Sequence, residues 1–165
     1  METKTNFNQG VFFNPEERTD VWATPIDFFN KINERYKLNL DVCAKPSNAK
    51  CKNFFTPEID GLKQKWVGRV WMNPPYGREI KKWIKKAYEE VENGNSEIAV
   101  CLVPARTCSA WWHEYCMKGE ILFIRHRLKF GGSKINAPFP NALVIFSNEH
   151  VNTYKAIDRE GNLVI

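Results

Sequence analysis

Segments with apolar residues at helical spacing alternate along the chain with short apolar runs typical of strands. Three segments repeat apolar residues at helical spacing, which predicts amphipathic helices over residues 26–36, 80–91 and 109–117. Short apolar runs lie between these segments and predict strands over residues 38–42, 69–72, 97–103, 120–124 and 142–146. Strands that alternate with helices are typical of an open α/β sheet, mostly parallel and flanked by helices.

Turn-forming residues mark where these elements begin and end. Thr24 followed by Pro25 predicts the N-cap and the first position of the first helix. Asn93 and Gly94 predict the end of the second helix. Residues 131–141 are too irregular for a helix or a strand, so they predict a long loop of the kind that carries function.

The length of the chain predicts a single domain. A chain of 165 residues can bury a substantial core but is short for two domains. We expect one compact domain over residues 21–150. Residues 1–20 show no clear period and predict an N-terminal arm, whereas residues 151–165 predict a C-terminal extension that can form a hairpin around residues 158–162.

The composition is that of an ordinary globular protein in water, with 43% hydrophobic and 26% charged residues. No stretch approaches the ~20 consecutive apolar residues of a membrane span, and the first residues lack the apolar core of a signal peptide. These features predict a cytoplasmic protein that does not contact membranes. The five cysteines form no C-x-x-C pair and the three histidines are scattered, so we expect no metal site.

Positive charge exceeds negative charge and gathers in two places. The 24 lysines and arginines outnumber the 19 acidic residues, and the net charge of +5 favours polyanionic partners. The two cationic groups consist of Lys81, Lys82, Lys85 and Lys86, and of Arg125, Arg127, Lys129 and Lys134. They are expected to flank one groove and contact phosphates, although a lysine-rich helix face is also typical of plain exposure to solvent.

The tetrapeptide Asn73-Pro74-Pro75-Tyr76 carries the most specific chemical signal. It follows the apolar run 70–72 and precedes the second helix, which predicts a loop between a strand and a helix. Two prolines remove two backbone donors, so the Pro74 carbonyl and the Asn73 side chain remain as acceptors for an amine. Tyr76 adds a flat face on which a planar group can stack. A rigid turn explains one proline but not the whole set, so the motif predicts a pocket for an amino-bearing base.

Six motifs occur in an order that resembles one enzyme family. They are Trp22-x-Thr24-Pro25, Leu40-Asp41-Val42-Cys43-Ala44, Asp60-Gly61-Leu62, Asn73-Pro74-Pro75-Tyr76, Val103-Pro104-Ala105-Arg106-Thr107 and Arg127-Leu128-Lys129-Phe130. Together they cover about residues 20–147 and resemble phage and prophage Dam-like DNA N6-adenine methyltransferases. The resemblance implies a Rossmann-like methyltransferase catalytic domain over residues 21–150. It also implies S-adenosylmethionine as the methyl donor and N6 of adenine in double-stranded DNA as the acceptor, in a bacterial host cell.

The resemblance assigns cofactor contacts to residues on both sides of the first strand. The implied cofactor-binding residues are Trp22, Thr24, Pro25, Asp41, Ala44 and Asp60. Asp41 ends a predicted strand, where open sheets bind ligands, and would lie beside the amino group or the ribose of the cofactor. Asp60 would lie nearer the adenosine, although Asp-Gly is also an ordinary turn. The chain lacks a glycine-rich G-x-G turn after this strand, so the individual contacts stay open.

The same resemblance assigns the methyl acceptor to the tetrapeptide and DNA contacts to later residues. Asn73 and the Pro74 carbonyl would accept the two N6 hydrogens of an adenine that has left the duplex stack, with Pro75 keeping the loop rigid. Tyr76 would stack on one face of the base and Phe130 on the other. The implied DNA contacts are Arg106, Thr107, Arg127, Lys81 and Lys82.

Several alternatives share part of this pattern. Enzymes that methylate RNA bases or the glutamine amide of proteins also use Asn-Pro-Pro-Tyr, and a small-molecule N-methyltransferase fits the basic charge less well. A noncatalytic DNA-binding module would need neither the tetrapeptide nor a cofactor pocket. No target-recognition insertion follows Tyr76, so specificity is expected to reside in loops such as 131–141 and can be either site-specific or relaxed. No dimer signature is visible, and a monomer is expected.

Overall fold

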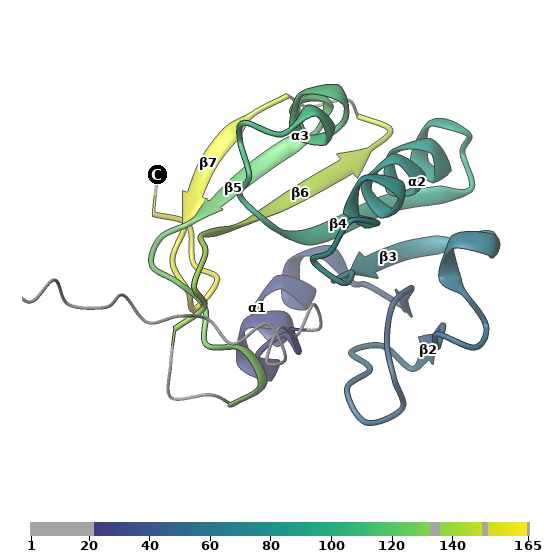
Figure 1. Ribbon diagram of the computed structural model, residues 1–165, viewed down its shortest axis with the longest axis horizontal. Helices are drawn as coiled ribbons and strands as arrows, with labels where there is room; N and C mark the ends of the chain where they lie inside the picture. Colours follow the sequence, from purple (N-terminus) through teal and green to yellow (C-terminus); the bar gives the residue numbers. More distant parts are fainter. Residues whose placement is uncertain (1–21, 133–135, 150–151, 165) are drawn as a thin grey trace, which may run out of the picture.

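A mixed seven-stranded sheet forms the centre of the computed structural model, which describes residues 22–132, 136–149 and 152–164. The predicted arm over residues 1–20 lies outside the described residues. The strands are β1 Leu40–Asp41, β2 Asn53–Phe54, β3 Gly68–Met72, β4 Ser96–Pro104, β5 Glu120–Ile124, β6 Asn141–Ser147 and β7 Tyr154–Ile157. Their order across the sheet is β2-β1-β3-β4-β6-β5-β7, and Figure 1 follows it from β7 to β3.

The sheet is mostly parallel, as the alternation of helices and strands predicted. Strand β6 is antiparallel to both of its neighbours, β4 and β5, whereas the other four pairs of adjacent strands are parallel. The α/β fold class and the Rossmann-like methyltransferase arrangement are therefore confirmed. None of the helices in the described ranges combines the length and the apolar composition needed to cross a membrane.

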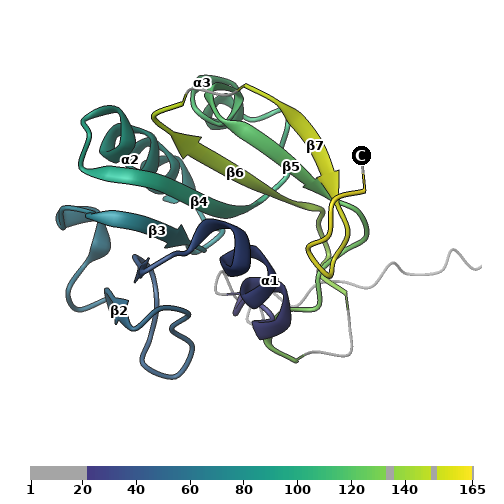
Figure 2. The same cartoon turned by 180° about the vertical axis from the view of Figure 1, so that it is seen from behind.

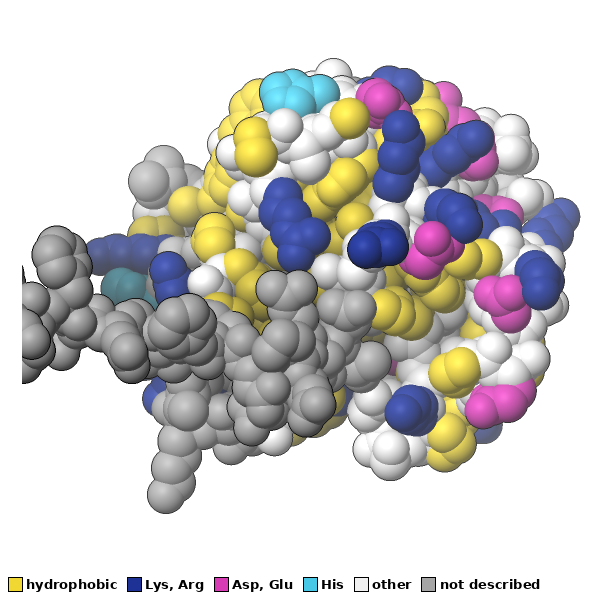
Figure 3. All heavy atoms as spheres, in the orientation of Figure 1, with side chains coloured by type: hydrophobic (Ala, Val, Ile, Leu, Met, Phe, Trp, Pro, Cys, Tyr) yellow, Lys and Arg dark blue, Asp and Glu magenta, His cyan; other side chains and the backbone are white. Residues whose placement is uncertain are grey.

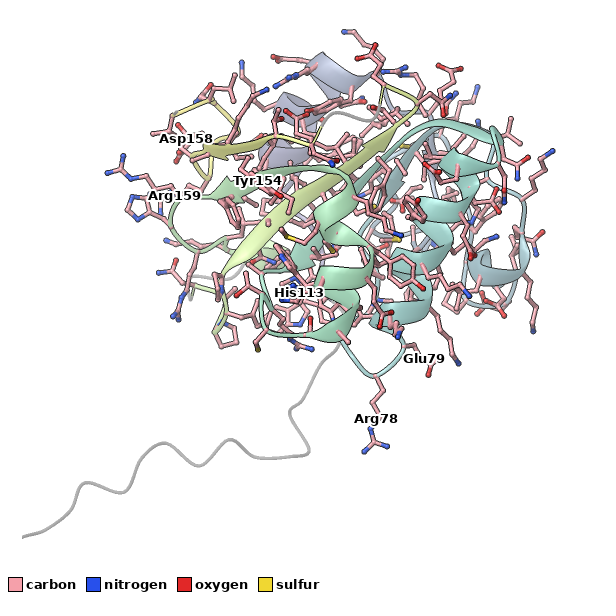
Figure 4. The ribbon with its side chains drawn as sticks, turned by 90° about the horizontal axis from the view of Figure 1, so that it is seen from above. Arg78, Glu79, His113, Tyr154, Asp158 and Arg159 are labelled. Atoms are coloured by element: carbon pink, nitrogen blue, oxygen red, sulfur yellow. The ribbon has the colours of Figure 1, made fainter. Side chains whose placement is uncertain are left out.

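Helices cover both faces of the sheet. The α-helices are α1 Ile26–Tyr36, α2 Ile80–Glu92 and α3 Ala110–Glu114. Short 3-10 helices lie at Gly61–Lys63, Cys116–Lys118 and Phe130–Gly132. Helices α2 and α3 lie on one face and α1 lies on the other (Figures 2 and 4). Because both faces are covered, the central strands β4 and β6 are buried along nearly their whole length.

The first helix begins one residue later than the Thr24-Pro25 pair predicted. Pro25 occupies the N-cap position and no side chain caps the helix, and the Thr24 hydroxyl accepts a hydrogen bond from Asn73. The buried face of α1 consists of Phe28, Phe29, Ile32 and Tyr36, whereas Ile26 is 54% exposed instead of packing on the core. The residues before α1 are therefore free to take part in the site described below.

Two strands have no clear counterpart in the sequence pattern. Strand β2 has only two residues, which is too short for any period to appear. Strand β7 pairs in parallel with β5, and the chain then turns back so that Leu163 forms an isolated antiparallel bridge with Ile157. The segment after residue 151 thus adds an edge strand to the sheet.

Candidate active site

The candidate site lies at the carboxyl ends of β1 and β3, which are adjacent strands. Their register places Asp41 opposite Trp71, and Asn73 follows β3 directly. A cleft of about 750 Å³, counted out to open solvent, opens at this edge. Its lining includes seven sequence-predicted residues, namely Trp22, Thr24, Asp41, Ala44, Asp60, Asn73 and Pro75. The structure therefore brings most of the predicted cofactor residues together with part of the tetrapeptide.

Asp41 is a buried carboxylate that shapes one wall of the cleft. It is only 2% exposed, and its two oxygens accept hydrogen bonds from the backbone N–H of Cys43 at 3.3 Å and of Lys50 at 3.0 Å. Burial raises the pKa of Asp41 above its usual value of 3.8, because loss of hydration outweighs these two hydrogen bonds and the nearby Lys50 charge. The buried negative charge favours a cationic ligand group in the cleft.

Aromatic side chains supply the apolar surface of the cleft. Phe55, Trp71 and Trp83 line it beside Trp22, and none of the first three was predicted as a site residue. Phe55 follows the short strand β2, whereas Trp71 and Trp83 belong to an apolar strand and an apolar helix face. Their sequence signal was therefore that of core residues. A cleft with aromatic walls and one buried carboxylate fits a ligand that joins a planar ring to a cation.

Two backbone features complete this part of the cleft. Asp60 has a left-handed φ of 57°, and its carboxylate accepts from the Leu62 N–H at 3.2 Å, so the residue both forms a turn and lines the cleft. The next residue, Gly61, lies against the chain just after β1: a Cβ atom there would come within 2.2 Å of the Val42 carbonyl oxygen. Ala44 is 6% exposed and donates its N–H to the Phe55 carbonyl at 3.0 Å.

Asn73 presents an acceptor without a partner. Its side-chain nitrogen Nδ2 donates to the Trp22 carbonyl at 2.5 Å and to the Thr24 hydroxyl at 2.9 Å, which uses both amide hydrogens. Its oxygen Oδ1 is buried and accepts no hydrogen bond from the described residues. Buried acceptors are usually paired in proteins, so this oxygen marks a place where a ligand donor fits.

The two prolines of the tetrapeptide differ in position. Pro75 lines the cleft, whereas Pro74 is buried and does not. No N–H in the described part of the chain donates to the Pro74 carbonyl, so this oxygen is available as a second acceptor. Pro25 serves as the N-cap of α1 and does not line the cleft.

Tyr76 lies beneath other aromatic side chains. Its ring is 3% exposed and makes edge contacts with Phe139 at 5.4 Å and with Phe130 at 6.2 Å between centroids. Its hydroxyl donates to the Leu102 carbonyl at 3.2 Å and accepts from Asn141 Nδ2 at 3.4 Å, and burial raises its pKa. A planar ligand can stack on Tyr76 only after one of the covering rings has moved.

The rings beside Tyr76 form one aromatic cluster with Trp22. Phe139 lies 5.1 Å from Trp22 and 6.4 Å from Phe130, while Trp22 and Phe130 are 5.6 Å apart. The backbone supports this packing, since the Gly131 N–H donates to the Ala23 carbonyl at 2.8 Å. Phe139 is half-buried and was not among the predicted residues, because the segment 131–141 offers no period that distinguishes it.

The lysines of α2 are paired with carboxylates. Lys81 lies 2.7 Å from Glu114 and Lys82 lies 2.5 Å from Glu79. The helix carries two more lysine–glutamate pairs, Lys85 with Glu89 and Lys86 with Glu90. Figure 3 shows carboxylates interspersed with the cationic side chains over the surface formed by α2. The net positive charge of this helix face is thus smaller than the lysine count indicates.

The two arginines that the resemblance assigned to DNA have no carboxylate partner in the described residues. Arg106 donates to the Tyr76 carbonyl at 3.4 Å, and Arg127 donates to the Ala137 carbonyl at 3.5 Å. Thr107 is exposed, and its carbonyl contacts a ring nitrogen of His113. Arg78, which was not among the predicted site residues, extends away from the loop before α2, two residues after the tetrapeptide (Figure 4).

Comparison with known proteins shows which family the chain resembles. Residues 13–158 match the family described as DNA N-6-adenine-methyltransferase (Dam). A protein of Escherichia phage T1 named DNA N-6-adenine-methyltransferase is 38% identical over 104 residues, which are 61% of this chain and 42% of the phage protein. A protein of the same name from Haemophilus phage HP1 (strain HP1c1) is 34% identical over 110 residues, 64% of this chain.

The aligned part of the chain spans 42% of the length of the first relative and 62% of the second. The family match, in contrast, covers most of the chain and contains all six motifs that carried the resemblance. That resemblance is therefore confirmed: the chain belongs to the Dam family of DNA N-6-adenine-methyltransferases.

Proposed function

We propose that this chain transfers a methyl group from S-adenosylmethionine to N6 of adenine in DNA. The observation that carries the proposal is the Asn73 amide, whose two hydrogens are both engaged while its buried oxygen has no partner in the described part of the chain. An exocyclic amine of a base has the N–H donor that this oxygen lacks. Both phage relatives carry the name of the same activity.

The cleft has the chemistry that S-adenosylmethionine requires. Its aromatic walls, Phe55 and Trp83, suit the adenine ring of the cofactor, and the buried Asp41 carboxylate suits its ammonium group or its ribose hydroxyls. When bound, the cofactor supplies a methyl group activated by a positively charged sulfur. We propose that Asp41, Ala44 and Asp60 hold its adenosine and amino-acid parts.

Asn73 and Pro74 position the acceptor. Asn73 Oδ1 accepts one N6 hydrogen of adenine and the Pro74 carbonyl accepts the other, which fixes the nitrogen at the mouth of the cleft. As N6 becomes methylated it gains positive charge, and the two oxygens stabilise that charge until a proton leaves. The amine of cytosine would satisfy the same acceptors, so the choice of adenine rests on the family.

Entry of the base requires a change in the aromatic cluster. Phe139 and Phe130 cover the ring of Tyr76, so we propose that the flipped adenine displaces one of them and then stacks on Tyr76. Phe139 is the more accessible of the two, because it is half-buried whereas Phe130 is 4% exposed. Base flipping costs a few kcal/mol, which stacking between aromatic rings offsets in part.

Arg78 is expected to contribute more to DNA affinity than the paired lysines of α2. The Arg78 guanidinium has no carboxylate partner among the described residues and can contact a phosphate directly, whereas Lys82 must first leave Glu79. Arg78→Ala should weaken DNA binding at all sequences and lower the slope of log affinity against log salt by about 1. Fluorescence anisotropy at several salt concentrations measures both quantities.

The matched control is Arg159→Ala. This arginine is also exposed, but it pairs with Glu160 and lies far from Arg78 in Figure 4. Equal losses of affinity in the two variants would reduce the role of Arg78 to a general charge effect.

Cofactor affinity is expected to fall as the pH is lowered. In the free protein, burial raises the pKa of Asp41 above 3.8, and a cationic ligand would lower this pKa by favouring the carboxylate. Binding therefore releases a proton, and affinity decreases as pH falls through the raised pKa of the free protein. Calorimetry with S-adenosylmethionine, from neutral pH towards the usual carboxyl range, measures the effect.

Methylthioadenosine, which lacks the amino-acid part, is the control ligand for this titration. Its affinity should be independent of pH if Asp41 meets the ammonium group, and should follow that of the full cofactor if Asp41 meets the ribose. A flat profile for both ligands would remove Asp41 from cofactor binding.

The direct test of the function is methylation of unmethylated DNA. The protein is incubated with S-adenosylmethionine and plasmid DNA, and N6-methyladenine is quantified by mass spectrometry after digestion to nucleosides. N6-methyladenine should appear, and sequencing of the product should then distinguish one site from relaxed specificity. A protein that binds the cofactor but leaves DNA unmodified would redirect the search to RNA or protein acceptors.

A further inference from the structure

The chain segment before α1 accepts two hydrogen bonds from the Asn73 side chain, and a role in cofactor binding does not explain them. Thr24 is 4% exposed, and its hydroxyl accepts from Asn73 Nδ2 at 2.9 Å. The Trp22 carbonyl accepts from the same nitrogen at 2.5 Å. Segment 22–24 therefore binds the amide through its two N–H donors, and the amide oxygen has no partner among the residues that the structure describes.

These two hydrogen bonds determine which way the amide faces. With the amide reversed, Oδ1 would lie 2.5 Å from the Trp22 carbonyl oxygen, and two acceptors at that distance repel. The amide hydrogens would then face the ligand and would meet the N–H donors of an amine. An acceptor oxygen is presented to the ligand only in the observed orientation.

The two acceptors are held in place by their own packing. Trp22 contacts Phe130 and Phe139 through ring edges, and the Ala23 carbonyl accepts from the Gly131 N–H at 2.8 Å. Thr24 is not used as the helix cap, because Pro25 occupies that position. Its hydroxyl is therefore available to Asn73 rather than to the backbone of α1.

We propose that Thr24 is a positioning residue for the methyl acceptor, which acts by holding the Asn73 amide with its oxygen towards the target amine. This inference rests on the proposed function and differs from the cofactor contact that the sequence resemblance implied for Thr24. It makes the segment before the first helix part of the acceptor site. Loss of the hydroxyl leaves one amide hydrogen unpaired and allows the side chain to leave its orientation.

The test compares Thr24→Val, which keeps the shape but loses the hydroxyl, with Thr24→Ser, which keeps the hydroxyl. We expect kcat for methyl transfer to fall about tenfold in Thr24→Val and to stay within about twofold of the parent in Thr24→Ser. The Kd of S-adenosylmethionine, measured by calorimetry, should stay within about twofold in both variants. A raised Kd with unchanged kcat would overturn the proposal and make Thr24 a cofactor ligand.

A thermal double-mutant cycle gives a second reading that does not depend on activity. Thr24→Val should lower Tm in the parent protein but much less in an Asn73→Ala background, because the partner of the hydroxyl is then already absent. Additive shifts in Tm would overturn the proposal. If the parent protein methylates no DNA, the proposed function fails, and this cycle still decides whether Thr24 holds Asn73.

Discussion

Asn73→Ala should reduce the rate of methyl transfer to DNA by about 100- to 1,000-fold, the usual cost of removing one preorganised polar group from a reacting centre. The alanine removes the buried oxygen that has no partner among the described residues and that we assign to the N6 hydrogen. It leaves Asp41 and the aromatic walls of the cleft in place, so cofactor affinity should change by no more than a few-fold. Transfer of a tritiated methyl group to DNA and calorimetry with the cofactor measure the two quantities.

Asn73→Asp provides the matched variant. A carboxylate keeps two acceptor oxygens but cannot donate to the Trp22 carbonyl or the Thr24 hydroxyl. Its activity should therefore lie between those of the parent and Asn73→Ala. Thermal unfolding of each variant checks that the fold is retained. A folded Asn73→Ala protein with weakened cofactor binding and an unchanged transfer rate would assign Asn73 to the cofactor instead.

The sequence could predict the frame of the site because two strong local signals coincide. The alternating run over residues 38–42 has Asp41 near its end, and an apolar run ends just before Asn73. Parallel strands bring their carboxyl ends to one edge of the sheet. The order of the motifs then supported the family, which the match over residues 13–158 confirms.

The surroundings of these residues could not be predicted, because they depend on contacts between distant segments. Tyr76 has the flat aromatic ring that base stacking needs, yet Phe139, more than 60 residues later in the chain, packs against this ring. Lys81 has the charge of a phosphate ligand, yet Glu114 of α3 pairs with it. Both effects arise from tertiary packing, which no local period reports.

The Asn73 amide illustrates the same limit at the level of single atoms. The sequence identifies an amide in a loop with two prolines, but it does not say which end of the amide faces the ligand. That orientation depends on the Trp22 carbonyl, a backbone group whose position no residue type specifies. Residues 22–24 therefore affect the proposed adenine site through their position beside Asn73, although their motif resembled a cofactor-binding segment.

Gly61→Ala should lower the free energy of unfolding by about 3 kcal/mol, the upper end of the range for overpacking. The added Cβ would lie 2.2 Å from the Val42 carbonyl oxygen and 3.2 Å from the Trp83 ring. The first contact is with backbone, so no change of rotamer relieves it. Urea unfolding followed by circular dichroism measures the loss.

The same substitution should weaken cofactor binding about tenfold, because it alters two walls of the cleft together. Relief of the clash requires Val42 to move away from Gly61, and Val42 lies between Asp41, the last residue of β1, and Ala44, which both line the cleft. The Gly61 carbonyl also accepts from Trp66 Nε1 at 2.8 Å, which ties any movement of the turn to the core. Calorimetry with S-adenosylmethionine on the folded variant tests this effect separately from stability.

Gly94→Ala separates the steric clash from the general cost of replacing a glycine. Gly94 has a left-handed φ of 71°, but nothing lies within 4 Å of its added Cβ. The alanine there should cost about 1 kcal/mol of stability through backbone strain and leave cofactor affinity unchanged. If both variants lost stability equally and bound the cofactor like the parent, the close packing of Gly61 against Val42 would not be what shapes the cleft.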